Sequence, residues 1–175
     1  MRLILIVTFS LFISNFSIAQ INHIQNNKNR HNNTQNKANS SIDIVTLIYC
    51  LNGLKVEDAD SYFLKKGYEY SGTTKYGDST LFRYKRHNSF QSVGLYYFNN
   101  KIVESFYYTT SDAESSKVMS IVKSYGFIYK STLASTNNVS YTDFIKKDFK
   151  LTLMKKHFED EQTSAFYICL KKLNN

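Results

Sequence analysis

The same helix-to-strand junction occurs twice in this chain. The two copies, residues 61–70 and 120–129, align at an offset of 59 that places Gly67 over Gly126. In each copy a short helical pattern reaches the glycine and leaves as a strand rich in aromatic residues. Glycine has no Cβ, so it readily takes the left-handed conformation that ends a helix and lets the chain reverse. The sequence therefore predicts two tandem repeats, each a helix followed by strands.

The composition favours sheet. The chain of 175 residues is 42% hydrophobic and contains 14 Tyr and 13 Phe, but no Trp and no Pro. Aromatic and β-branched residues fit pleated, half-buried surfaces. We therefore expect a β-rich α+β protein.

The N-terminus has the pattern of a secretory signal peptide. Arg2 precedes an apolar run at 3–13, and a small-residue cleavage pattern follows at 17–19. A membrane-spanning helix needs about 20 apolar residues, and Ser14 ends the run too early. The prediction is a cleaved signal at 1–19 and a secreted or periplasmic protein without a membrane span.

Residues 20–41 are predicted to be a disordered linker, because eight Asn and three Gln leave little to bury. Residues 42–175 then form a single α+β domain made of the repeats 42–110 and 111–175. The net charge of +8 falls to +4 without the first 41 residues, since four of the basic residues lie there. A folded part this mildly basic gives little support for a polyanionic partner.

The expected fold is built from helices and two four-strand antiparallel meanders. We expect the meanders to join edge to edge in one continuous sheet, with the helices on a single face. Ser41 and Asp112 are the candidate N-caps, and Asn99-Asn100 predicts a tight hairpin. Helices are expected at 41–51, 56–66 and 112–125, and strands at 68–71, 80–86, 91–98, 101–109, 127–133, 139–146, 149–157 and 164–172.

This order of elements resembles a known family. The tandem helix-plus-meander arrangement over 42–175 is similar to the duplicated unit of the beta-lactamase inhibitory protein family, and each half resembles cystatin-like or PepSY-type modules. The resemblance is one of architecture and transfers no site residue. It implies a non-catalytic binding surface on the open face of the sheet.

Two cysteines, Cys50 and Cys169, lie near the two ends of the folded region. In an oxidising compartment a disulfide between them would close a loop of about 120 residues, worth about 4–5 kcal/mol. The alternative is a pair of buried thiols that act as small apolar side chains.

The catalytic and metal-binding motifs in the sequence are weak. The spacing of Ser120 and Lys123 matches S-x-x-K, but the accompanying S-D-N and K-T-G motifs are absent. The four histidines are scattered, and neither H-E-x-x-H nor C-x-x-C occurs. Residues 66–70 resemble the base-stacking strand of RNA-binding modules, but Glu69 replaces the small residue required there. We expect no enzyme activity, no cofactor, no metal and no nucleic-acid partner.

Tyrosines and basic residues on the predicted strands mark a candidate interaction surface. Consecutive tyrosines in a strand place one ring on each face of the sheet, and tyrosine is favoured at interfaces. The alternatives are rings that only pack against one another and a basic strand that is only solvated. The candidate residues are Tyr97, Tyr108, Arg83 and Lys85.

These observations lead to the hypothesis of an exported, non-catalytic module that binds another envelope or secreted protein through a tyrosine-rich sheet face. One alternative is a binder or hydrolase for a small molecule or glycan, with a pocket inside a curved sheet. An inhibitor or immunity protein would differ from the first hypothesis only in what its partner does.

Overall fold

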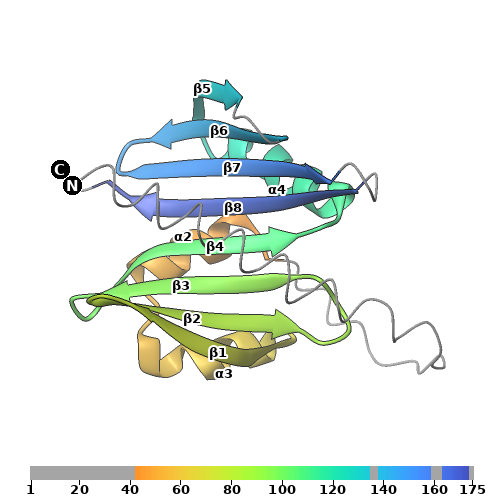
Figure 1. Cartoon of the computed structure of the whole chain (residues 1–175). Helices are drawn as coiled ribbons and strands as arrows, with labels where there is room; N and C mark the ends of the chain where they lie inside the picture. Colours follow the sequence, from red (N-terminus) through yellow and green to blue (C-terminus); the bar gives the residue numbers. More distant parts are fainter. Residues whose placement is uncertain (1–41, 135–137, 159–162, 174–175) are drawn as a thin grey trace, which may run out of the picture. The chain divides into compact units, whose positions relative to one another are not determined.

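One eight-stranded antiparallel sheet with helices on one side forms the folded part of the chain (Figure 1). The computed structural model describes residues 42–134, 138–158 and 163–173. The expected α+β class and the single continuous sheet are confirmed. The predicted signal peptide at 1–19 and the linker at 20–41 lie outside the described residues.

The eight strands follow the order β1-β2-β3-β4-β8-β7-β6-β5 across the sheet. The last strand in sequence therefore lies beside β4 in the middle, while β1 and β5 form the two edges. All eight expected strands are present, within one or two residues at most ends. The strands are β1 (Tyr68–Tyr76), β2 (Ser79–Arg86), β3 (Ser92–Phe98), β4 (Lys101–Thr109), β5 (Ile128–Ala134), β6 (Val139–Lys146), β7 (Phe149–Phe158) and β8 (Thr163–Lys172).

The hairpin between β3 and β4 turns at the predicted pair of asparagines. Asn99 and Asn100 have φ angles of 47° and 60°, and Phe98 pairs directly with Lys101. Two consecutive residues with positive φ match the right-handed twist of the flanking strands, and asparagine tolerates this conformation. The hairpin prediction is confirmed.

The helices are α2 (Ile44–Asn52), the short 3₁₀ helix η1 (Val56–Asp58), α3 (Ala59–Lys65) and α4 (Asp112–Ser124). The Asp43 carboxylate caps α2 by accepting from the amide of Thr46 at 2.8 Å, and the Ser111 hydroxyl caps α4. The predicted cap Asp112 was wrong by one residue, because the cap residue must be extended and Ser111 has that conformation. Ser41, the other predicted cap, lies outside the described residues, and the prediction was wrong because the cap of α2 is Asp43. Among the helices of the described chain, none is long and apolar enough to cross a membrane.

The two glycine junctions have nearly the same local structure. Gly67 and Gly126 have φ angles of 80° and 79°, which are left-handed as expected. The strand after each glycine contains a bulge, between Tyr70 and Gly72 in β1 and between Tyr129 and Ser131 in β5. Each of the two tyrosines also shares a hydrogen bond with a threonine three residues later.

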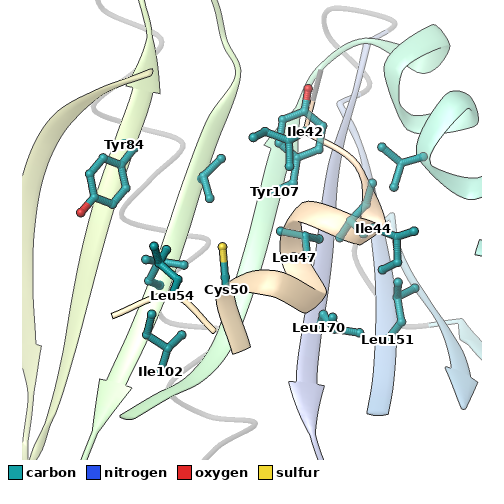
Figure 2. Close-up of a cluster of buried hydrophobic side chains, with 14 of the residues drawn as sticks. Ile42, Ile44, Leu47, Cys50, Leu54, Tyr84, Ile102, Tyr107, Leu151 and Leu170 are labelled. Atoms are coloured by element: carbon teal, nitrogen blue, oxygen red, sulfur yellow. The ribbon is translucent and has the colours of Figure 1, made fainter. Parts of the chain in front are cut away.

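Helix α2 packs behind the junction of β4 and β8 and closes the core (Figure 2). Ile44 and Leu47 are fully buried against core residues such as Leu151 and Leu170. The Ser105 hydroxyl, on β4, donates to the carbonyl of Leu47 at 3.1 Å, which satisfies a buried polar group beneath the helix. One apolar cluster therefore spans both halves of the sheet.

Candidate binding face

The sheet face that points away from the helices is called the front face here. Strand alternation assigns side chains to it: Ile168 and Leu170 of β8 enter the core with α2, so Tyr167 and Cys169 point to the front. In the part of the chain that the structure describes, all helices lie on the opposite side of the sheet (Figure 1). The front face is therefore the side of the sheet that no described helix covers, although its central side chains, such as Tyr108 and Tyr167, are buried.

A row of paired residues crosses the front face from edge to edge. Strand register places one side chain from each strand in this row, which we call the tyrosine row. Its centre is the pair Tyr108 and Tyr167, both buried, with ring centroids 4.7 Å apart. Burial raises the pKa of Tyr167, and the nearby Tyr108 raises it further. In order from β1 to β5, the row is Glu69, Lys85, Ser92, Tyr108, Tyr167, Met154, Tyr141 and Leu133.

A polar cluster lies beside the tyrosine row in the middle of the front face. The Lys150 ammonium contacts the Asp143 carboxylate at 2.6 Å, and the Thr152 hydroxyl donates to the other oxygen of that carboxylate at 2.7 Å. On the neighbouring strands β8 and β4, Cys169 and Glu104 lie close enough for each to affect the pKa of the other. The cluster therefore offers hydrogen-bonding groups beside an aromatic surface.

The electrostatics of Glu104 and Cys169 are set mainly by burial. Burial raises the pKa of Glu104, while the hydrogen bond from Cys169 and the positive charge of Lys171 act in the opposite direction. Burial also raises the pKa of the Cys169 thiol well above its usual value, and the negative charge of Glu104 adds to this shift. Cys169 is thus a neutral thiol rather than a reactive thiolate.

Glycine at position 94 makes room for an aromatic ring on the front face. Gly94 pairs across the sheet with Phe106, and the ring of Phe106 lies over the glycine. A Cβ added to Gly94 would lie 2.1 Å from the Cζ atom of that ring. The tight fit holds Phe106 flat on the face beside Tyr96, whose ring centroid is 6.4 Å away.

The structure brings together three of the four predicted surface residues. Tyr108 and Lys85 belong to the tyrosine row, and Arg83 lies one row away, where its guanidinium donates to Thr74 at 2.6 Å. Tyr97 instead points to the helix side and packs against the core, where its ring centroid lies 6.2 Å from that of Phe82. Tyr97 therefore does not share a surface with the other three residues.

Tyr96, rather than the predicted Tyr97, occupies a position on the front face. A signal for this was present, since Val93 and Leu95 alternate with the small residues Ser92 and Gly94. The larger apolar set had to face the core, which puts Tyr97 in the core and Tyr96 in front. Burial and the negative charge of Glu104 raise the pKa of Tyr96.

The two cysteines are free in the structure, so the candidate disulfide is not formed. Cys50 projects from α2 into the core (Figure 2). Strand alternation places Cys169 on the front face, so the sheet lies between the two thiols. Backbone movement would be required to bridge two residues on opposite sides of a sheet. The structure has the alternative arrangement, a pair of buried thiols.

The weak catalytic and metal motifs are not assembled into a site in the described chain. The Ser120 hydroxyl donates to the carbonyl of Lys117 in its own helix at 2.8 Å, so it is not directed at Lys123. Groups of three or more histidine, cysteine, aspartate or glutamate side chains able to hold a metal ion are absent from the described residues.

Buried ionisable groups predict a loss of stability at alkaline pH. Burial raises the pKa of Cys50 from 9.0 to about 12, so between pH 9 and 12 the thiol loses its proton in the unfolded chain first. Each such group lowers the free energy of unfolding by up to about 1.4 kcal/mol per pH unit in that window. Cys50→Ala is expected to show a smaller decrease between pH 9 and 12, measured as urea midpoints at several pH values. If Cys50→Ala lost stability with pH as steeply as the parent protein, the raised pKa of Cys50 would be contradicted.

Comparison with protein-family models, with curated proteins and with solved structures found no significant match to this chain.

Proposed function

We propose that this protein is an exported, non-enzymatic module that binds another envelope or secreted protein through its front face. The observation that carries this proposal is the tyrosine row, which crosses the sheet on the side that has no described helix. The proposed localisation rests on the signal pattern at 1–19. An inhibitor or immunity protein would belong to the same class, since only the effect on the partner differs.

The chemistry of the front face supports a protein partner. Aromatic side chains supply large contact area at low conformational cost and are enriched where interfaces are most buried. Lys85 is exposed near one end of the row, where it pairs across the sheet with Glu69, and Arg83 lies next to it. These charges favour a partner whose apolar contact region has an acidic rim.

We further infer that the domain consists of two repeats, 42–110 and 111–175. Three features recur at the offset of 59 residues: the left-handed glycine, the bulge after it, and the tyrosine-to-threonine hydrogen bond. The order of the strands supports the same inference, because each half is a meander and the two halves meet through β4 and β8. The tyrosine row crosses this junction, so both repeats contribute to the proposed surface.

Affinity capture of the tagged, processed protein from envelope and medium fractions of its host tests the proposal. We expect a stoichiometric partner that Tyr108→Ser captures at least 10-fold less well, because the central ring pair is lost. Lys85→Glu alters an exposed residue of the same row and is expected to weaken capture several-fold without affecting folding. Thermal unfolding must first show that both variants are folded.

Tyr49→Ser is the matched control, because Tyr49 is 44% exposed on α2, on the opposite side of the sheet. Its capture is expected to equal that of the parent protein. Equal capture by Tyr108→Ser and Lys85→Glu would contradict the proposed site. Failure to recover any partner with folded bait would contradict the protein-binding class and favour the small-molecule alternative.

A further inference from the structure

The edge strand β5 exposes an unusual amount of apolar surface. Ile128, Tyr129 and Leu133 are 73%, 58% and 65% exposed. On its inner side β5 pairs with β6, and among the described strands none pairs with its outer side. An edge strand of this kind presents unpaired backbone groups together with apolar side chains, which is a template for another strand.

The opposite edge of the sheet is protected and provides a comparison. Strand β1 carries the charged residues Glu69 and Lys75, and helix α3 packs against it. Tyr70 is the large apolar side chain of β1 that is strongly exposed, at 51%. Charges and a covering helix are the usual means by which an edge avoids pairing. Strand β5 has one charged residue, Lys130.

A hollow of about 330 Å³ lies at the start of β5 and is basic. Its lining includes the three lysines Lys130, Lys146 and Lys147 together with the apolar side chains of Ile128 and Ile145, and no acidic side chain. Lys146 is held in place, since its ammonium donates to a backbone carbonyl and lies over two aromatic rings. Lys130 and Lys147 are exposed. The hollow therefore favours negatively charged groups.

We propose that β5 is a strand-addition site for an extended protein segment that alternates acidic and apolar residues. The segment adds a ninth strand through backbone hydrogen bonds. Its apolar side chains cover Ile128 and Leu133, which register places on the front face opposite Ile145 and Tyr141. Its carboxylates reach Lys130 and Lys147 and form charge-assisted hydrogen bonds.

The alternative occupant, β5 of a second copy, is disfavoured by charge. An antiparallel pair of two β5 strands centred on Lys130 would place the two copies of this residue directly opposite each other across the new ladder. Like charges placed in this way in a sheet are destabilising. An acidic segment instead neutralises the same lysine.

Titration of the full, processed chain with the blocked peptide Glu-Val-Glu-Val-Glu-Val tests the proposal. Addition of the peptide is expected to change the NMR chemical shifts of the backbone amides of β5 and to slow their hydrogen exchange. The affinity for the peptide is expected to fall as the salt concentration rises. Lys130→Glu combined with Lys147→Glu is expected to weaken binding at least 5-fold. Ile128→Lys is expected to weaken it as well, because it places a charge where the peptide packs.

Lys75→Glu, on the opposite edge strand, is the matched control and is expected to leave peptide affinity unchanged. The peptide Lys-Val-Lys-Val-Lys-Val should not bind. Shifts located outside β5, or equal binding by both peptides, would overturn the proposal. Self-association that Ile128→Lys abolishes, without peptide binding, would overturn it in favour of a second copy. Tyr108→Ser is expected to bind the peptide normally, so this result is separable from failure of the front-face proposal.

Discussion

Replacing Phe63 with alanine is expected to lower the free energy of unfolding by about 3–5 kcal/mol. Phe63 is 0% exposed on α3, and its ring stacks on that of Tyr84 with centroids 4.5 Å apart. The Tyr84 hydroxyl is anchored to Asp60 by a 2.8 Å hydrogen bond, so the neighbouring ring cannot easily move to fill the space. The truncation therefore leaves a cavity between the helix and the sheet.

Urea unfolding followed by circular dichroism measures this loss, and the next residue provides the control. Leu64 is 63% exposed, so Leu64→Ala is expected to change the free energy of unfolding by no more than about 0.5 kcal/mol. A loss below about 1 kcal/mol for Phe63→Ala would mean that α3 is not packed on the sheet as described.

Gly94→Ala is expected to destabilise the fold by about 1–3 kcal/mol, even though alanine is the smallest possible addition. The new Cβ would lie 2.1 Å from the ring of Phe106, which must leave its position or force the two strands apart. The ring is 3% exposed and Gly94 pairs with it directly, so little room exists for adjustment.

A double-mutant cycle distinguishes this clash from the general effect of replacing a glycine. Phe106→Leu in the Gly94→Ala background is expected to recover part of the loss, because the smaller side chain leaves room for the added methyl. Gly53→Ala is the control, since its Cβ would meet the movable ring of the exposed Tyr49 at 3.0 Å. If the changes in the free energy of unfolding caused by Gly94→Ala and Phe106→Leu simply added, the close contact between the two residues would be contradicted.

Strand positions were predictable from the sequence because alternation is strong in most of them. The exception is β1, which was expected to end at residue 71 and continues to Tyr76. Ser71 and Gly72 resemble a break in the sequence, but the bulge absorbs Ser71 and pairing resumes at Gly72. A bulge depends on the partner strand, so periodicity within one strand does not reveal it.

The sides of the sheet were harder to assign, as Tyr97 and Cys50 show. Both faces of the central strands carry aromatic rings, so ring content does not separate core from front. The position of the helices decides the question, because the face that α2 covers becomes the core. Once Leu170 is placed beneath α2, alternation alone puts Cys169 on the other side from Cys50 and removes the disulfide.

The strand order also has a consequence for the timing of folding. Strand β8 is made last but lies in the middle of the sheet, and it alone joins the second meander to β4. Until β8 has emerged from a ribosome or a translocation pore, β4 is a bare edge, although β1–β4 can already pair with one another. The pairing of β8 with β4 and with β7 must wait until β8 has been made. A chain that stops before β8 would lack the link between its two halves.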